Sequence, residues 1–190
     1  QPSVYSITVS DVGLDGIPDL VVPSIGANVV SVFMGDGEGG FGQPIVTPTT
    51  VKPFTSVLTD LNGDGLPDLV LSSFALSSSG TGFAPGRLEM RLGLGAGQFG
   101  PPVVHSIPAG SGPSRSPFAD LNEDGAVDIV LGGPAGISVL LGFGDGGFAP
   151  AQPFAAPGSA SLLGDVDGDG DVDIVAGSQK ATAVLLNGLR

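Results

Sequence analysis

Five aspartates occupy alternate positions of one nine-residue stretch: Asp165, Asp167, Asp169, Asp171 and Asp173. Carboxylates this close repel each other unless a cation lies among them. The spacing D-x-D-x-D-G-x-x-D is typical of a loop that wraps a hard cation. Side chains at positions 1, 3, 5 and 9 and the carbonyl at position 7 supply oxygen ligands, and a glycine at position 6 permits the sharp turn. The stretch therefore predicts a metal-binding loop.

The same pattern begins at three further aspartates, Asp11, Asp60 and Asp120. The first loop has Gly13 at position 3, so we expect it to bind a cation most weakly and the last loop most tightly. The predicted ligands of the four loops are Asp11, Asp15, Asp19 and the carbonyl of Ile17; Asp60, Asn62, Asp64, Asp68 and the carbonyl of Leu66; Asp120, Asn122, Asp124, Asp128 and the carbonyl of Ala126; and Asp165, Asp167, Asp169, Asp173 and the carbonyl of Asp171.

An all-oxygen ligand set favours Ca²⁺ over Zn²⁺ or Cu²⁺, whereas Mg²⁺ requires a stricter octahedron with more water. We therefore expect up to four Ca²⁺ ions. The competing interpretation is a set of Asx-rich turns without metal. Four matched copies in one chain weigh against that interpretation.

The net charge of −13 reflects these loops, because all but four of the 19 acidic residues lie in them. The exceptions are Asp36, Glu38, Glu89 and Asp145. Six Lys and Arg residues, scattered along the chain, argue against nucleic-acid binding. Cysteine is absent, which excludes thiolate chemistry. No run has the pattern of a signal peptide or a transmembrane helix, so membrane insertion is not expected.

Catalysis has few candidate residues. His105 is the single histidine, and we expect it to be a solvated side chain on an outer strand. No nucleophile-elbow motif accompanies it, and the carboxylates are assigned to metal rather than to acid–base work. No glycine-rich loop carries the lysine that a phosphate site needs. The sequence thus predicts a protein that is not an enzyme and that holds no organic cofactor.

The four loops must be positioned by short strands, since 33 Gly and 17 Pro leave little room for long helices. Each loop is led by a short strand and followed by two apolar strands, a glycine-rich turn and a more polar strand. The turns of the first three repeats end in Phe41, Phe99 and Phe148. We expect an all-β fold in which four repeats, at about 1–52, 53–112, 113–157 and 158–190, form one domain. The segments 72–86 and 109–116 are expected to be loops within it.

A meander of up to four antiparallel strands cannot bury both faces alone, but it can when stacked on its neighbours. This favours the four-stranded blades of a β-propeller over a sandwich or a β-solenoid. The repeat also resembles the FG-GAP/VCBS repeat of calcium-binding β-propellers, found in integrin α-chain heads. The resemblance is carried by the acidic loops, by the following strands such as Asp19-Leu20-Val21-Val22, and by the turns ending in Phe.

The resemblance implies that each loop connects the first and second strands of a blade and holds Ca²⁺ on one face of a disc. Propellers of this family usually have about seven blades. Four repeats therefore imply a partial ring, or a homo-oligomer that completes it. The expected function is a non-catalytic, extracellular binding or adhesion module, secreted or on the cell surface, with structural metals and an unknown protein or glycan ligand. The alternatives are the propeller portion of a polysaccharide-active enzyme such as a lyase, and a lectin.

Overall fold

The computed structural model describes residues 3–76, 83–108, 112–133, 136–156, 160–178 and 181–185. Side chains are described for these residues except within 74–76, 83–84, 112–117 and 160–161. Throughout the described residues the regular structure is β-strand, and no helix occurs. The prediction of an all-β fold is therefore confirmed.

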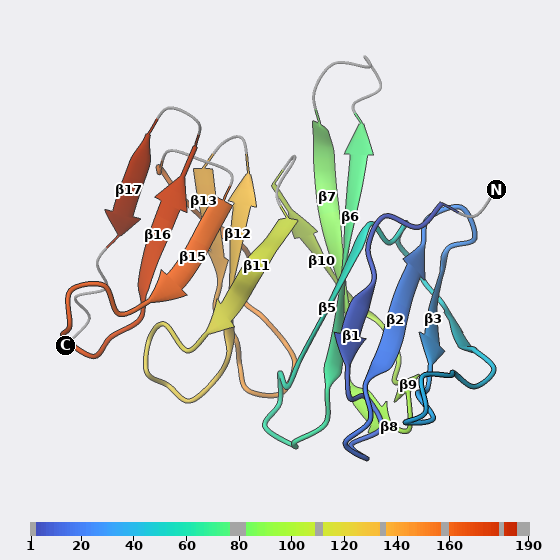
Figure 1. Cartoon of the computed structure of the whole chain (residues 1–190). Coiled ribbons are helices and arrows are strands. Elements are labelled where there is room, and N and C mark those ends of the chain that lie inside the picture. Colours follow the sequence, from blue (N-terminus) through green and yellow to red (C-terminus); the bar gives the residue numbers. More distant parts are fainter. Residues whose placement is uncertain are drawn as a thin grey trace. The chain divides into compact units, whose positions relative to one another are not determined.

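The strands form four antiparallel meanders, each in chain order (Figure 1). The first sheet contains β1 (Thr8–Ser10), β2 (Asp19–Ser24), β3 (Val29–Phe33) and β4 (Ile45–Pro48). The second contains β5 (Thr55–Thr59), β6 (Asp68–Leu76), β7 (Phe83–Arg91) and β10 (Val103–Ile107). The third contains β11 (Gly112–Ala119), β12 (Asp128–Gly133), β13 (Gly136–Leu140) and β14 (Gln152–Phe154). The fourth contains β15 (Ala160–Gly164), β16 (Asp173–Gly177) and β17 (Thr182–Leu185).

The glycine-rich turns also share one backbone arrangement. In the second repeat the turn pairs β8 (Gly93–Gly95) with β9 (Gln98–Phe99), and Gly93 lies opposite Phe99. The first and third repeats make the same bridge, between Gly35 and Phe41 and between Gly142 and Phe148. The phenylalanine that ends each turn is thus fixed next to the end of the third strand.

Alternation along the strands gives each sheet two distinct faces. In the first sheet Val21 lies opposite Val32, and Leu20 lies opposite Phe33. Val21 and Val32 are fully buried, whereas Leu20 and Phe33 on the other side are half-buried. We name the two faces by the residues that follow the last aspartate of each acidic loop. The first and third of these residues lie on face A, and the second lies on face B. Face B thus carries Val21, Val70, Val130 and Val175 in the four sheets.

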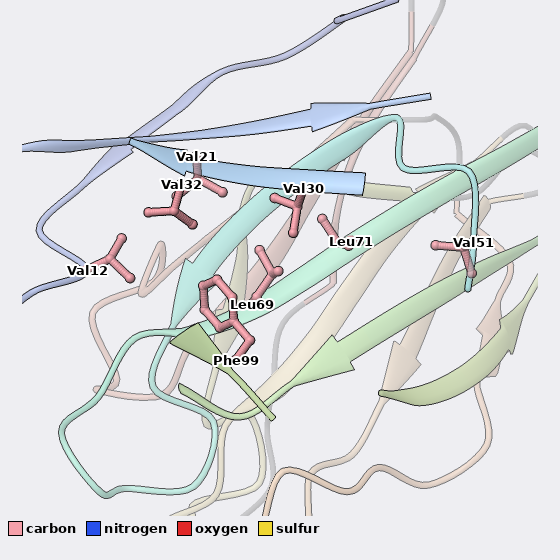
Figure 2. Close-up of a cluster of buried hydrophobic side chains, with 8 residues drawn as sticks. All are labelled: Val12, Val21, Val30, Val32, Val51, Leu69, Leu71 and Phe99. Atoms are coloured by element: carbon pink, nitrogen blue, oxygen red, sulfur yellow. The ribbon is translucent and has the colours of Figure 1, made fainter. Parts of the chain in front are cut away.

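Two apolar clusters join neighbouring sheets through these faces. In the first cluster, Val21, Val30 and Val32 from face B of the first sheet point toward Leu69 and Leu71 from face A of the second (Figure 2). Val12, Val51 and Phe99 complete it. Burial of such side chains contributes about 1.5–3 kcal/mol each, so this cluster stabilises the contact between the two sheets.

The second cluster repeats the arrangement in the third and fourth sheets. Val130 and Val139 from face B of the third sheet pack with Ile174 and Ala176 from face A of the fourth. The chain divides into two compact units, Gln1–Ser73 with Arg87–His105 and Phe74–Gly86 with Ser106–Arg190. One cluster lies in each unit. The expected repeat boundaries and the single domain stay predictions.

Two expected loops are wrong. Residues 72–76 and 83–86 extend β6 and β7 rather than forming a loop, and 112–116 belong to β11. The serines and glycines of these segments are tolerated because antiparallel pairing satisfies their backbone whatever the side chain. Residues 77–82 and 109–111 lie outside the described residues. The alternation of apolar and polar residues over 5–10 predicts a strand there, but β1 begins only at Thr8.

Candidate metal centres

Each acidic loop connects the first and second strands of its sheet, as the resemblance implies. The four loops share one backbone path, because position 6 is a glycine with positive φ in every copy. Position 4 also has positive φ in all four, although it is Leu14 in the first loop and Glu123 in the third. This conformation is strained for residues other than glycine. The loop conformation is therefore set by the whole hydrogen-bonded turn and not by glycine alone.

The aspartate at position 1 organises the turn from inside. In the second loop, Asp60 accepts hydrogen bonds from the amides of Gly63 and Gly65, both at 2.8 Å. Asp11, Asp120 and Asp165 accept the equivalent bond from the glycine at position 6, at 2.8, 2.8 and 3.1 Å. Such Asx-type bonds pre-form the loop and turn the carboxylate toward its centre.

The aspartate at position 5 binds the amide of position 7 in all four loops. The bonds run from Ile17 to Asp15, Leu66 to Asp64, Ala126 to Asp124 and Asp171 to Asp169, at 2.8–3.0 Å. Each bond holds the backbone of position 7 beside the position 5 carboxylate. Position 7 is where the sequence predicts a carbonyl ligand.

Position 3 differs between the loops. Asn62 and Asn122 each donate to the neighbouring aspartate, Asp64 or Asp124, at 2.9 and 2.8 Å. The amide oxygen of each asparagine also accepts from the backbone amide of the same aspartate, at 3.1 and 3.3 Å, and its second lone pair could serve a cation as a neutral ligand. At Gly13 in the first loop, an added Cβ would lie 2.8 Å from Cε of Met34. Met34 therefore fills the space that a ligand side chain would need there.

The closing aspartate at position 9 is buried in every loop. Asp19, Asp68 and Asp128 have no exposed surface and Asp173 is 1% exposed. Asp68 accepts from the amide of Leu61 at 2.7 Å and from that of Gly93 at 2.6 Å. Desolvation by burial raises the pKa of the Asp68 carboxyl, as it does for Asp128. A nearby cation would offset that cost, and each oxygen retains a lone pair for one.

The fourth loop brings carboxylates closest together. Oxygens of Asp165, Asp167 and Asp173 lie within 4.8 Å of one another. Two oxygens on opposite sides of Ca²⁺ are about 4.6–5.2 Å apart, so this spacing fits one shared ion. Partial loss of solvation and repulsion from the Asp169 and Asp173 carboxylates raise the pKa of Asp167, and a hydrogen bond with the backbone of Asp169 opposes this rise. The acidic groups are thus held together at an electrostatic cost.

Asp169 and Asp171 complete the predicted set of the fourth loop but lie outside this group. Asp171 is 7% exposed, and its Oδ2 has no hydrogen-bond partner among the described residues. In the other three loops the described aspartates do not form a comparable group of three. In those loops position 3 is glycine or asparagine, so no carboxylate occupies the position that Asp167 has in the fourth loop.

Sequence reasoning missed the residues that hold the closing aspartates from outside the loop. The amides of Gly35, Gly93 and Gly142 donate to Asp19, Asp68 and Asp128, respectively, at 2.6–2.8 Å. These glycines begin the glycine-rich turns, which the sequence analysis interpreted only as turns. In each of the first three repeats such a glycine follows the third strand, and this recurrence was the signal in the sequence that could have identified them. A side chain there would collide with the backbone carbonyl before the closing aspartate.

His105 lies on β10, the outer strand of the second sheet, as expected, but it is half-buried rather than solvated. Burial lowers the pKa of its imidazole.

The described residues contain no helix long and apolar enough to cross a membrane.

These features define an all-β repeat protein with four oxygen-lined loops on its strand connections. The sequence profile of FG-GAP-like repeats matches residues 6–71 and 120–176, more than half of the chain. The chain therefore belongs to the FG-GAP-like repeat family.

Two further comparisons accompany that match. The chain is 33% identical over 84 residues to integrin alpha-PS5 of Drosophila melanogaster, covering 43% of this chain and 8% of that protein. It thus spans a small part of that relative's length. Among solved structures, it resembles an Agrocybe aegerita lectin that specifically recognises non-reducing terminal N-acetylglucosamine. That similarity has a TM-score of 0.44 and 19% identity, over 97% of this chain and 63% of the lectin chain.

Proposed function

We propose that this chain is a Ca²⁺-stabilised β-propeller module that binds a partner outside the cell and has no catalytic role. The observation that carries the proposal is the shared geometry of the four loops, with the three converging carboxylates of the fourth. Family membership supports it, because the two matched ranges contain all four acidic loops in full.

Calcium is the cation that best fits the donors. The loops offer carboxylate, amide and carbonyl oxygens and no nitrogen or sulfur ligand, which suits a hard ion. Asp165, Asp167, Asp169 and Asp173, with the carbonyl of Asp171, would hold the ion of the fourth loop. When bound, the ion supplies positive charge that offsets the repulsion and desolvation of these carboxylates. Each metal would thus clamp the connection between two strands.

The propeller architecture is supported by the way the sheets pack. In each compact unit, face B of one sheet covers face A of the next. The strand order also runs regularly from the first to the last strand of each meander. The same face-to-face packing in both units is what the radial stacking of propeller blades would produce.

The binding role and the extracellular location rest on family membership and on the metal loops. Loops of moderate affinity stay filled where Ca²⁺ is millimolar, which is outside the cell. Integrin alpha-PS5 suggests an adhesion partner, although this chain corresponds to only 8% of it. Trp is absent and Tyr5 is the single Tyr, which leaves few of the rings on which sugars stack. A protein partner is therefore the preferred ligand.

Titration with CaCl₂ in an isothermal calorimeter tests the metal assignment. We expect the loop of Asp165 to bind most tightly, those of Asp60 and Asp120 next, and that of Asp11 most weakly. Asp165→Asn should remove the tightest transition, and Asp11→Asn the weakest. Binding of no Ca²⁺, or loss of the tightest transition in Asp11→Asn, would overturn this assignment.

A separate assay tests the binding role. Chain immobilised in CaCl₂ should retain cell-surface protein, and treatment of the cells with a protease should abolish retention. Persistence after protease together with signals on a glycan array would instead establish a lectin. Release of unsaturated sugar products from polyuronates would establish the lyase alternative.

A further inference from the structure

The two asparagines of the acidic loops, Asn62 and Asn122, differ in the residue that follows them. Both occupy position 3 of their loop, and both are half-buried. Asn62 is followed by Gly63, whereas Asn122 is followed by Glu123. Glycine has no Cβ, so it leaves its own backbone nitrogen open to the side chain of the preceding residue. The two loops therefore form a matched comparison for a reaction between an asparagine side chain and the next backbone nitrogen.

That reaction is deamidation, the loss of the side-chain amide. The backbone nitrogen of Gly63 attacks Cγ of Asn62 and forms a cyclic imide. The proton of the attacking nitrogen leaves with the side-chain amide as ammonia. Water then opens the imide at either of its two carbonyls, which gives aspartate or isoaspartate. One water is consumed for each ammonia released, and nothing is oxidised or reduced.

Three hydrogen bonds engage the reacting groups of the second loop. The amide of Gly63 donates to Asp60 Oδ1 at 2.8 Å. Nδ2 of Asn62 donates to Asp64 Oδ2 at 2.9 Å, and Oδ1 of Asn62 accepts from the amide of Asp64 at 3.1 Å. All three bonds lie at the surface, where water competes for the same groups. They therefore restrain the side chain of Asn62 only weakly.

The third loop restrains its asparagine in the same way. Nδ2 of Asn122 donates to Asp124 Oδ2 at 2.8 Å, and Oδ1 of Asn122 accepts from the amide of Asp124 at 3.3 Å. The residue after the asparagine has positive φ in both loops, 75° at Gly63 and 58° at Glu123. The main difference is thus the side chain of Glu123, which crowds the nitrogen that would attack.

A bound cation would hold Asn62 more firmly than these hydrogen bonds do. In the proposed Ca²⁺ site the amide oxygen of Asn62 is a ligand, and Asp60 and Asp64 bind the same ion. The side chain then cannot turn toward Gly63 without leaving the ion. We expect only the empty loop to react, so this step rests on the proposed function. When free Ca²⁺ is a hundredfold above Kd, about one loop in a hundred is empty.

We propose that Asn62 is a deamidation site and that the cation of the second loop controls its reaction. The empty loop converts Asn62, and the filled loop protects it. Hydrolysis of the imide does not regenerate asparagine, so each conversion is permanent. The chain thereby records, in its covalent structure, how long its second loop has been without a cation.

Conversion changes the ligands of the second loop. The aspartate product places a carboxylate at position 3, where the fourth loop has Asp167. The isoaspartate product instead routes the main chain through the side-chain carbons of residue 62. That change displaces the amides of Gly63 and Gly65 from Asp60, which they contact at 2.8 Å. Both products add negative charge to the loop.

Incubation of the full chain in CaCl₂ and in EDTA, at one pH and temperature, tests the proposal. Peptide mass spectrometry measures conversion at Asn62 and Asn122, and circular dichroism verifies that the chain stays folded. In EDTA, Asn62 should convert at least about tenfold faster than Asn122. In CaCl₂, conversion of Asn62 should slow at least about tenfold. Asn187, which glycine also follows, lies outside the described residues, and its peptide is quantified separately.

A control variant separates local opening of the second loop from general loss of stability. Asp120→Ala in CaCl₂ removes a ligand of the third loop and leaves the second loop intact, so Asn62 should stay protected. Rapid conversion of Asn62 in this variant would overturn control by the cation of the second loop. If EDTA unfolds the chain, Asp60→Ala in CaCl₂ replaces the EDTA sample, because it removes a ligand of the second loop alone.

Exchange of the residues at position 4 tests the reaction itself. In EDTA, Gly63→Glu should slow conversion of Asn62 at least about tenfold. Glu123→Gly should give Asn122 the rate that Asn62 has in the unsubstituted chain. Leu14 and Glu123 already occupy position 4 with positive φ, so the loop accepts a side chain there.

Equal conversion of Asn62 and Asn122 in EDTA would overturn the proposal, and so would an unchanged rate in Gly63→Glu. Equal conversion of Asn62 in CaCl₂ and in EDTA would overturn the control by the cation. Calorimetric titration of the same sample with CaCl₂ identifies what has failed in that case. If Ca²⁺ binds, equal rates overturn this inference alone. If no Ca²⁺ binds, they overturn the proposed function and the cation control together.

Discussion

Asp68 Oδ1 accepts a hydrogen bond of 2.6 Å from the backbone amide of Gly93, 25 residues further along the chain. Its Oδ2 accepts from the amide of Leu61 within the loop. One buried carboxylate therefore joins the metal loop to the turn that follows the third strand. Asp128 makes the same pair of contacts with Leu121 and Gly142. The closing aspartates are thus structural connectors as well as candidate ligands.

Replacement of a closing aspartate should destabilise the protein even without metal. In Asp128→Ala, the amides of Leu121 and Gly142 would both lose their buried acceptor. We expect a loss of roughly 2–4 kcal/mol in the free energy of unfolding, at about 1–3 kcal/mol per unsatisfied donor. Urea denaturation in EDTA measures it. The matched control is Asp124→Ala in the same loop, whose side chain is exposed. Equal losses in the two variants would show that the connection has no special role.

The glycine that receives this connection should not tolerate a side chain. A Cβ at Gly93 would lie 2.5 Å from the carbonyl oxygen of Pro67, a backbone atom that cannot move aside alone. We expect Gly93→Ala to cost roughly 1–3 kcal/mol of unfolding free energy through overpacking. Gly177→Ala serves as the control, because nothing lies within 4 Å of its added Cβ. Chemical denaturation of the two variants should rank them in that order, and the reverse order would contradict the packing described for the turn.

A buried ion pair ties the segment before the second sheet to β7. Glu89 accepts from Arg91 Nε at 2.7 Å and from the amide and hydroxyl of Thr50 at 2.7 and 2.6 Å. Arg91 also donates to the carbonyls of Gly100 and Pro48. We expect Glu89→Ala to cost roughly 3–5 kcal/mol, because it leaves a buried guanidinium without its partner.

The double variant Glu89→Leu with Arg91→Leu is the comparison for this pair. Removal of both charges should cost less than twice the single loss, since no unpaired charge remains. Equilibrium unfolding in urea gives both values. If Glu89→Ala unfolded at the same urea concentration as the unsubstituted chain, the ion pair would not contribute to the stability of the fold.

His105 should make stability depend on pH in a defined direction. Burial lowers its pKa in the folded protein below the ordinary value of 6.5. The unfolded chain then binds a proton that the folded chain does not, so stability should fall as the pH drops from about 7 to 5. His105→Gln should show a smaller fall over the same window, because His105 is the single histidine. Thermal melts at several pH values measure this, and equal slopes for the two proteins would contradict it.

Much of the fold could be predicted from the sequence because the acidic loops mark the start of every second strand. Asp19, Asp68, Asp128 and Asp173 each begin a strand as expected. The strand extensions at 72–76 and 83–86 were not predicted, because the Ser and Gly residues between 72 and 86 indicated a loop.

The candidate sites were predicted in part. The ligand positions follow from spacing, and the structure brings Asp165, Asp167 and Asp173 together. The amide of Gly93 could not be foreseen as a partner of Asp68, because a contact across 25 residues depends on how the third strand returns to the loop. The obstruction of Gly13 by Met34 has the same origin, since it depends on packing between separate segments.

Thermal unfolding with and without Ca²⁺ tests the central claim most directly, that the four loops are structural Ca²⁺ sites. A filled site stabilises the folded state by about 2.7 kcal/mol when free Ca²⁺ is a hundredfold above its Kd. We therefore expect the Tm in millimolar CaCl₂ to exceed the Tm in EDTA by several degrees or more, with MgCl₂ giving a smaller increase. An identical Tm in CaCl₂ and in EDTA would contradict the account.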